Sequence, residues 1–531
     1  MKKIGFFVTC ILLSTATLFA QMEMDAYRYS QTELTGSARS VAMGGAFGAL
    51  GGDISALTSN PAGLGVYQSS EVVTTLNFMN NKATTNMKGI SMNDTRFTFS
   101  LDNIGSVLSF SNNNGGRFNM GFSFNKKYSY NNRYNVSGKN MSSSLADYIA
   151  ETTNRWNNNG GIHKDDLLIE NGNYPFEYGY SWLSVMGYNS FLINPQTTGK
   201  PDNDNYYYNP IYPNSDVNST MSVDERGSAS DYTFSLGGSM LDDKLYMGGS
   251  FALTDIDYRM ESIFEEKFQG NKEGSYRLRN SLETEGIGFN MKLGVIFRPI
   301  NAIRIGAAYH SPSWHTLTDR YSAAIIPNGI RYEDNPAGIV SSPRDYYSYN
   351  FSTPEKWVIS AAGILGRRAI ISADWEITNY RHMRMNYYDA GMMNTFIEED
   401  FRTTHTLRAG VELKVMPQFS LRGGAEFRTG AIKPDVVKDI ANNSLQIETA
   451  GTTPHFTVDK GSQTYTFGLG YRFTKSFYTD LACALIYNNA DYYNFSALPY
   501  NPNDGEIGVS SDRGTIKTNR TKVLWTLGYK F

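Results

Sequence analysis

The sequence predicts an all-β protein, a transmembrane antiparallel β-barrel of about 14 strands. Three observations indicate this fold. Many segments alternate apolar and polar residues with a period of two, as a strand with one apolar face does. The connections between these segments are alternately short and long, and the chain ends in an alternating strand whose last residue is aromatic. Bacterial membrane barrels combine these features with an even number of strands.

Composition favours one barrel over several soluble domains or a bundle of membrane helices. Charged residues make up 19% and aromatic residues 14% of the 531 residues, and the mean hydropathy is −0.40. Beyond the N-terminal segment, no apolar run reaches the ~18 residues that a spanning helix needs. A barrel has this average because its apolar residues occupy every second position and its lumen is polar. The net charge of −3 and the lack of a binding motif exclude nucleic acid as a partner.

The alternation is clearest in 464–473, where Tyr465, Phe467 and Leu469 share one face and threonine and glycine occupy the other. The segment 407–415 alternates in the same way. A soluble β-sandwich would give the same local pattern, because its inner face is apolar and its outer face polar. The choice between the two folds therefore depends on the connections.

The connections follow the parity expected of a barrel, with short periplasmic turns opposite long extracellular loops. The expected strands are 70–80, 104–112, 117–135, 229–240, 244–262, 275–298, 302–320, 346–364, 368–384, 402–415, 418–430, 463–473, 476–492 and 515–531. Tight turns are expected at 113–115, 241–243, 299–301, 366–367, 416–417 and 474–475, and long loops at 136–228, 321–345, 385–401, 431–462 and 493–514. The segment 93–112 is either one kinked strand or two.

The last strand carries Val523, Trp525, Leu527, Tyr529 and Phe531 on one face. A final aromatic residue on such a strand resembles the signal that the barrel-assembly machinery reads during insertion. We therefore expect Phe531 to act as the insertion signal and that machinery to be a partner. The predicted location is the cell outer membrane of a Gram-negative bacterium, in contact with its lipid.

The N-terminus has the pattern of a secretory signal peptide over residues 1–20. Lys2 and Lys3 precede an apolar stretch, and cleavage is expected after Ala20. Because Cys10 lies within this segment, Cys483 is the only cysteine of the mature chain. A disulfide within one mature chain is therefore excluded.

Residues 21–69 differ from the rest of the chain because small residues crowd the stretch 36–53. Small side chains allow backbone segments to pack closely in a confined space. A phosphate-binding loop is rejected, since no strand precedes the glycines and no lysine follows in the required position.

The runs Gly36-Ser37-Ala38-Arg39-Ser40, Met43-Gly44-Gly45-Ala46 and Asn60-Pro61-Ala62-Gly63-Leu64 resemble the start of FadL/TodX-type outer-membrane transporters. The resemblance implies a fourteen-stranded barrel, residues 70–531, whose lumen is plugged by a small N-terminal hatch, residues 21–69. Asn60, Pro61, Ala62, Gly44 and Gly45 would then belong to the hatch. It also implies passive uptake of long-chain fatty acids or other hydrophobic small molecules, which would be the partner.

Two alternatives to uptake come from the same fold family. PorV-type proteins serve secretion by carrying cargo, and other members are described as haem-binding receptors. A general diffusion porin is a third alternative, and a plugged lumen argues against it.

The loop 136–228 is the candidate for an external ligand groove. It gathers Phe176, Tyr178, Tyr180, Trp182 and Met186 within a short span, and a surface loop rarely exposes so much apolar area without a binding role. The alternative is that these residues form the loop's own small core over the barrel mouth. Both interpretations remain open at this stage.

Strand parity places several charged side chains in the lumen, among them Arg304, Arg408 and Arg422. An arginine with apolar neighbours is suited to a ligand carboxylate. The alternative is that the lumenal charges pair with one another and anchor the hatch.

Nothing in the sequence indicates an enzyme. The six histidines lack the spacing of a catalytic zinc site, and no motif supports a serine–histidine pair. We expect no metal and no cofactor.

Overall fold

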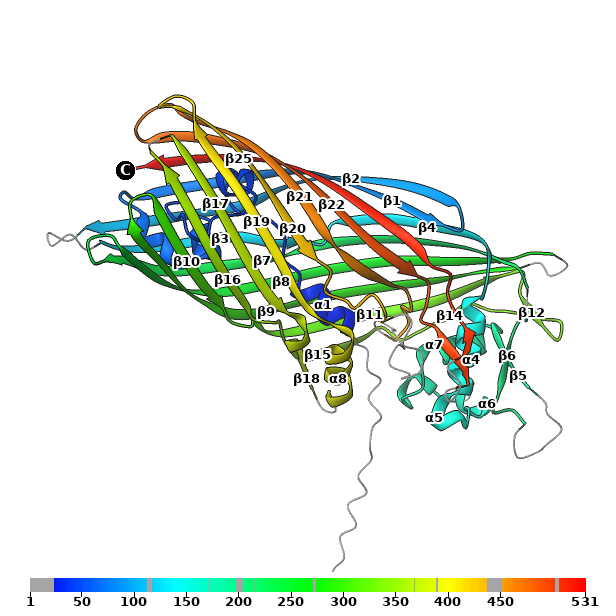
Figure 1. Ribbon diagram of the computed structural model, residues 1–531. Coiled ribbons are helices and arrows are strands. Elements are labelled where there is room, and N and C mark those ends of the chain that lie inside the picture. Colours follow the sequence, from blue (N-terminus) through cyan, green and yellow to red (C-terminus); the bar gives the residue numbers. More distant parts are fainter. Residues whose placement is uncertain are drawn as a thin grey trace, which may run out of the picture.

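The computed structural model describes residues 23–111, 117–170, 172–196, 204–213, 215–270, 274–366, 368–387, 390–436, 451–501 and 506–531. The expected signal peptide, 1–20, and the expected turn 113–115 lie outside these residues. The described chain forms an antiparallel barrel with helices in its lumen and over one end (Figure 1).

Fourteen passes of strand make the wall, as the sequence predicts. In chain order they are β1 (Glu71–Met87), β2 (Ile90–Ser111), β3 with β4 (Arg117–Ser129, Asn132–Met141), β7 (Val217–Met240), β8 (Leu245–Phe268), β9 (Ser275–Ile300), β10 with β11 (Ile303–His310, Trp314–Asn328), β15 with β16 (Asp345–Ser352, Lys356–Leu365), β17 with β18 (Ala369–Asn379, Arg384–Asn386), β19 (Thr403–Lys414), β20 (Phe419–Thr429), β21 (Phe456–Arg472), β22 (Phe477–Tyr493) and β25 (Gly514–Lys530). The first and last strands pair from Glu71↔Lys530 to Asn86↔Thr515. This pairing closes the barrel.

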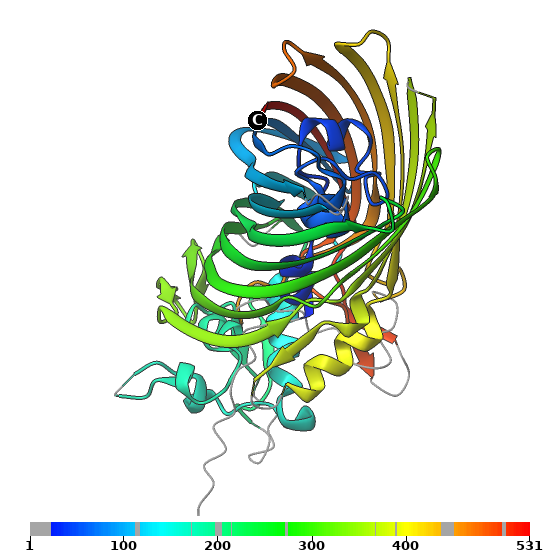
Figure 2. The ribbon, with the colours of Figure 1, turned by 90° about the vertical axis from the view of Figure 1, so that its left-hand side faces the viewer.

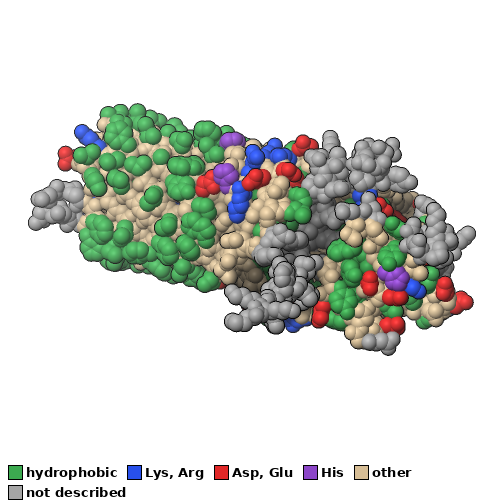
Figure 3. Space-filling model, turned by 90° about the horizontal axis from the view of Figure 1, so that it is seen from below, with side chains coloured by type: hydrophobic (Ala, Val, Ile, Leu, Met, Phe, Trp, Pro, Cys, Tyr) green, Lys and Arg blue, Asp and Glu red, His purple; other side chains and the backbone are tan. Residues whose placement is uncertain are grey.

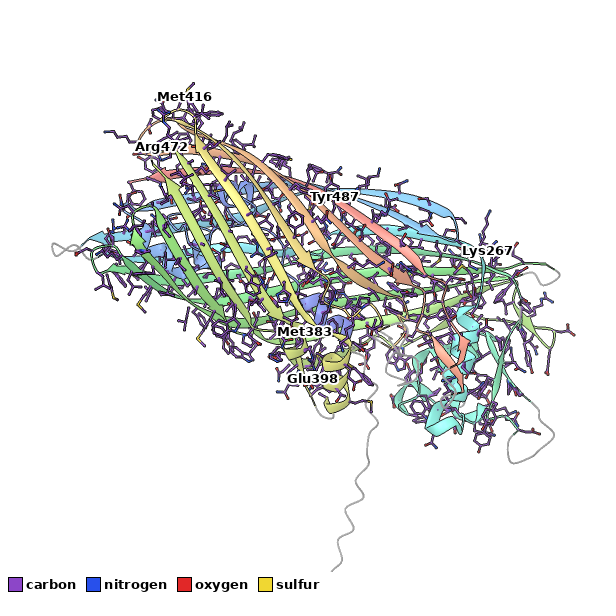
Figure 4. All side chains as sticks on the ribbon, viewed as in Figure 1. Lys267, Met383, Glu398, Met416, Arg472 and Tyr487 are labelled. Atoms are coloured by element: carbon purple, nitrogen blue, oxygen red, sulfur yellow. The ribbon has the colours of Figure 1, made fainter. Side chains whose placement is uncertain are left out.

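The two ends of the barrel differ as expected. Met416 and Arg472 mark tight turns at the end where the chain terminates, and Lys267 and Glu398 lie toward the opposite end (Figure 4). We assign the tight-turn end to the periplasm. The expected loop 136–228 is shorter at both ends, because β4 runs to Met141 and β7 begins at Val217.

The segment 93–112 is one strand with a β-bulge. In β2, Asn103 pairs with Thr75 and Leu101 pairs with Leu76, which leaves Asp102 without a partner in the ladder. The extra residue turns the Asp102 side chain into the lumen, where it is fully buried. The expected strands 70–80 and 104–112 were too short, because β1 and β2 continue as a long hairpin to a turn at Lys88 and Gly89.

A belt of apolar side chains covers the outside of the barrel near its periplasmic end (Figure 3). The exposed side chains of the wall include Phe97, Phe118, Phe122, Phe234, Phe251, Leu253, Phe289, Leu293, Phe297, Trp357, Trp375, Leu407, Phe467, Trp525 and Tyr529. Exposure of such residues to water would be costly, whereas lipid accommodates them. The wall therefore has the lipid-facing surface of a membrane barrel. Among the described residues, no helix has the length and apolar character needed to cross a membrane.

The N-terminal segment lies inside the barrel (Figure 2). Its helices are α1 (Glu23–Ser30), α2 (Ala38–Ala42), α3 (Ala56–Ser59) and the 3-10 helix η1 (Pro61–Val66). Helix α1 packs in the apolar core of the extracellular half, whereas α2 to η1 contact the wall nearer the periplasmic end. We call residues 31–69 the hatch.

The remaining elements lie at the extracellular end. They are α4 (Leu145–Asn154), α5 (Trp156–Asn159), α6 (Lys164–Leu167), η2 (Pro175–Glu177), α7 (Trp182–Asn189), β5 (Ile193–Pro195), β6 (Tyr208–Pro210), β12 (Arg331–Tyr332), β13 (Asn335–Pro336), β14 (Val340–Ser341), η3 (Tyr380–His382), α8 (Gly391–Asp400), β23 (Leu498–Asn501) and β24 (Glu506–Val509). We call the part between β4 and β7 the cap. Its buried residues belong to the same apolar core as α1 and the upper wall.

Candidate functional site: a plugged lumen with three cavities

The residues of the predicted hatch motif make hydrogen bonds within the hatch and pack against the barrel wall. Asn60 Nδ2 donates to the Gly48 carbonyl at 2.6 Å, and Asn60 Oδ1 accepts from Ala62 N at 3.1 Å. Pro61 opens η1, a position that suits proline because the missing N–H has no partner there. Asn60 therefore ties two turns of the hatch together.

Glycines of the wall provide the space in which the hatch packs against it. A Cβ on Gly294 would lie 1.9 Å from Asn60 Oδ1, and one on Gly424 would lie 2.3 Å from the Met43 carbonyl carbon. On the hatch side, Gly44 has φ +65° and a Cβ there would meet the Ala425 backbone at 2.8 Å. The predicted motif glycine Gly44 and the wall thus approach each other backbone to backbone.

Buried ion pairs and carboxylate caps fasten the hatch. Glu412 accepts from Arg39 of α2 at 2.8 Å and from Arg422 of the wall at 2.7 Å. Asp374 accepts from the backbone N–H groups of Phe47 and Gly48 at 3.0 and 2.9 Å. The bulge residue Asp102 accepts from Gly36 N at 3.2 Å, so the strand irregularity has a role in hatch attachment.

The three lumenal arginines predicted from parity have different surroundings. Arg422 pairs with Glu412 and Asp480, and Arg304 donates to the Leu50 carbonyl of the hatch. Arg408 pairs with Glu376 and Glu426 and also lines a cavity beside the hatch. Arg422 thus pairs with other lumenal charges, which was the alternative to ligand binding. Contact with a ligand remains a prediction for Arg304, Arg408 and Arg422.

Three cavities follow one another through the lumen. The upper cavity, about 180 Å³, lies between α1 and the wall. The lower cavity, about 160 Å³, lies between the hatch and the wall. A neck of about 40 Å³ separates them; it shares Tyr128, Arg428 and Arg520 with the upper cavity and Thr32 and Glu33 with the lower one. The neck is the smallest of these three cavities.

The lower cavity is polar and rich in cations. Lys292 lies 3.6 Å from Asp231, and Lys356 lies 3.3 Å from Glu376 and donates to Thr32 at 2.7 Å. Lys127 lies on the same cavity. Its floor is the hatch, which contributes Ser55, Thr58 and Ser59.

The upper cavity is amphipathic. Its apolar walls are rings and thioethers of Met24, Tyr27, Tyr128, Tyr130, Tyr134, Met260 and Phe456, and its charged walls are Arg28, Glu225, Arg428, Asp459 and Arg520. The sequence analysis did not single out these tyrosines. Strand parity would not have found them, because these even-numbered positions continue the lipid-facing series of Phe118 and Phe122, and a register shift between Lys126 and Tyr128 separates the two series.

The predicted loop groove is largely a core. Phe176, Trp182 and Met186 are buried, and the Trp182 indole N–H donates to the Phe176 carbonyl. The Trp182 ring packs 5.2 Å from that of Tyr321 in β11, so the cap is docked on the wall. Tyr178 is 52% exposed and Tyr180 partly so; these two predicted ligand residues face the surface.

Glu266 attaches the cap to the wall. It accepts from Leu145 N at 3.0 Å and from the Ser144 and Tyr276 hydroxyls at 2.5 and 2.6 Å, at the N-terminus of α4. It lies on the extracellular extension of β8, far beyond the lipid-facing Leu253. Burial raises the pKa of Glu266 from its ordinary value of 4.5 to about 7.

This shift makes cap attachment depend on pH. A carboxyl group with a raised pKa favours the docked state while it is protonated, and that contribution is lost as pH rises from 4.5 through 7. We expect the protection factors of the α4 amides, which are corrected for the intrinsic pH dependence of hydrogen exchange, to be higher at pH 5 than at pH 8. Glu266→Gln should abolish this difference, and an equal pH dependence in the variant would contradict the assignment.

A closed barrel with a lipid-facing belt, a plugged lumen and a row of internal cavities defines an outer-membrane transport barrel. Residues 240–494 match the family described as "Outer membrane protein transport protein (OMPP1/FadL/TodX)". This stretch of the chain is similar to the OMPP1/FadL/TodX outer-membrane transporters of hydrophobic compounds.

A solved structure agrees at the level of fold. The crystal structure of a Pseudomonas aeruginosa FadL homologue matches with TM-score 0.51 and 13% identity, covering 94% of this chain and 99% of that chain. The Pseudomonas putida toluene transporter TodX matches with TM-score 0.46 and 11% identity, covering 94% and 99%. No curated protein sequence matches the chain.

Proposed function

We propose that this transporter takes up a small hydrophobic or amphipathic molecule without energy coupling, by way of the three cavities. The ligand enters beneath the cap, rests in the upper cavity, passes the neck and leaves beside the hatch after a local shift. The row of cavities that ends on the hatch carries this proposal. Exposed Tyr178 and partly exposed Tyr180 are suited to the first contact, while Arg408 in the lower cavity is suited to a ligand's polar end.

Removal of the hatch tests the closed state on which this route depends. Deleting 21–66 removes helix α1 together with hatch residues 31–66, which form the floor of the lower cavity, and should convert the barrel into an open pore. We expect hydrophilic solutes that the wild-type protein excludes to pass at much higher rates in a liposome-swelling assay. Unchanged exclusion would mean that the wall or cap, and not the hatch, closes the lumen.

The identity of the cargo separates uptake from secretion. Native mass spectrometry of the protein extracted in mild detergent from its own membrane should show a bound small hydrophobic molecule. A stoichiometric protein partner with no small molecule would favour a cargo shuttle of the secretion type instead.

Assembly partners belong to the same proposal. Phe531 is exposed at the end of β25, and its N–H donates to the Ser70 carbonyl at 3.0 Å, next to the closing seam. We infer that the barrel-assembly machinery reads this aromatic side chain and that outer-membrane lipid covers the belt. Deletion of Phe531 should lower the amount of heat-modifiable barrel in the outer membrane several-fold, whereas Phe531→Tyr should not. Equal yields would remove this role from Phe531.

A further inference from the structure

The upper cavity has aromatic walls on several sides. The rings of Tyr128 and Tyr130 are 5.1 Å apart, and Tyr130 lies 5.1 Å from Tyr258 in an edge-to-face arrangement. Tyr27 packs in the same way on Tyr380, at 5.4 Å. Neighbouring rings fix one another, so they present flat surfaces at a small cost in side-chain entropy. Such walls favour a ligand that contains a ring.

Arginine side chains lie over or beside these aromatic walls. The Arg520 guanidinium lies 5.9 Å from the centre of the Tyr128 ring, and that of Arg28 lies 4.9 Å from the centre of Tyr258. Arg428 lies 3.6 Å from Asp459. Each guanidinium has a fixed fork of N–H donors that matches a carboxylate.

Part of this donor set lacks an acceptor. Five residues that line the cavity each have a buried polar side-chain atom without a hydrogen-bond partner among the described residues: Tyr130 Oη, Arg428 Nε, His455 Nδ1, Asn488 Oδ1 and Arg520 Nε. The two Nε–H groups and the phenol can donate, so donors outnumber fixed acceptors. Buried polar groups are normally satisfied, and a molecule rich in acceptors would satisfy these.

The size of the cavity limits the ligand. Its volume of about 180 Å³ is below the roughly 300 Å³ at which pockets for drug-sized molecules begin. A long alkyl chain would need the neck open, whereas a single ring with a short acidic side chain needs only small adjustments.

We infer that the upper cavity binds a small ring-bearing carboxylic acid, with its ring against Tyr128 and Tyr130 and its carboxylate accepting from Arg428 and Arg520. This inference rests on the proposed function and names the class of substrate that the upper cavity, the first binding site on the uptake route, would hold. The unsatisfied donors next to aromatic walls distinguish this cavity from the lower one, where Lys292 and Lys356 are paired with carboxylates.

Three probes of equal carbon number separate the contributions of ring and acid: 4-phenylbutyrate, decanoate and butylbenzene. Isothermal titration calorimetry on the full-length mature barrel in detergent should give 4-phenylbutyrate about tenfold or more higher affinity than butylbenzene, because butylbenzene lacks the hydrogen-bonded carboxylate. The affinity should also be several-fold higher than that of decanoate, because decanoate has no ring to pack against the tyrosines. Equal or tighter binding of decanoate or butylbenzene would overturn the inference. In that case, continued uptake of decanoate or butylbenzene would leave the proposed function standing. If the protein took up none of the three probes, both the inference and the proposed function would be wrong.

Charge-conserving variants locate the site. Arg428→Lys and Arg520→Lys keep the positive charge opposite Asp459 and Glu33 but remove the Nε donor. Each should reduce the affinity for 4-phenylbutyrate about tenfold and leave butylbenzene unchanged. Arg96→Lys is the matched control, because Arg96 pairs with Asp224 and lines none of the three cavities.

Tyr130→Phe removes a hydroxyl without a partner and should fold normally, so a loss of acid binding in that variant cannot be ascribed to misfolding. Unchanged affinity in all three cavity variants would contradict the inference.

Discussion

Gly424→Val is expected to displace the hatch and make the outer membrane permeable to hydrophilic solutes. A Cβ at this position would lie 2.3 Å from the Met43 carbonyl carbon and 2.4 Å from Gly44 N, and backbone atoms so close cannot yield by a rotamer change. Since β20 is held by ladders on both sides, the hatch is the part that moves. The measurement is single-channel conductance in planar bilayers, where wild-type protein should be closed and the variant open.

The adjacent residue provides the control. Gly423 lies on the same strand, and a Cβ there would have only the Thr466 carbonyl oxygen nearby, at 3.8 Å. Gly423→Val should therefore insert and remain closed. Equal conductance of the two variants would show that a general weakening of β20, and not contact with the hatch, opens the barrel.

Loss of the Glu412 charge is expected to have the second large effect. Its side chain is 3% exposed and accepts from Arg39 of the hatch and Arg422 of the wall. Glu412→Gln removes the carboxylate that is shared by the buried Arg422 and the partly exposed Arg39. Breaking a buried pair such as Glu412–Arg422 costs about 3–5 kcal/mol. We expect a lower thermal midpoint of the barrel and frequent openings in the conductance record.

A double-mutant cycle with Arg39→Gln separates hatch attachment from wall stability. If the Arg39 contact carries the effect, the two substitutions together should cost less than the sum of each alone. Glu398→Gln is the control, since Glu398 pairs with Arg384 at the surface near α8 (Figure 4), where ion pairs contribute about 0–1 kcal/mol. Strict additivity would place the role of Glu412 in the wall alone.

The sequence was sufficient to predict the wall. Residues such as Tyr465, Phe467 and Leu469 alternate because lipid and lumen impose opposite requirements on successive side chains. All fourteen expected strands have a counterpart in the structure. The ends of the strands were less predictable. Strands β7, β8 and β9 continue beyond the apolar belt, where no lipid requires apolar side chains at every second position.

Features that depend on contacts distant in sequence were not predictable. The Asp102 bulge is defined by its partner strand β1 and by Gly36 of the hatch. Whether Trp182 faced a ligand or a core was open, and its packing on Tyr321 depends on how the cap docks. The upper cavity is assembled from α1 and several strands, so no single segment of sequence describes it.

The central claim is that ligand passes the hatch, and a reversible lock tests it most directly. A Cβ on Gly48 would lie 3.0 Å from the Cβ of Ser360 in β16, so a shift of about half an ångström brings a cysteine pair into the 3.5–4.5 Å range of a disulfide. The measurement is uptake of the bound ligand into liposomes by Gly48→Cys/Ser360→Cys protein that also carries Cys483→Ser. We predict that uptake stops on oxidation and returns on reduction, with each single cysteine variant unaffected. Undiminished uptake with the hatch covalently locked to the wall would contradict the account.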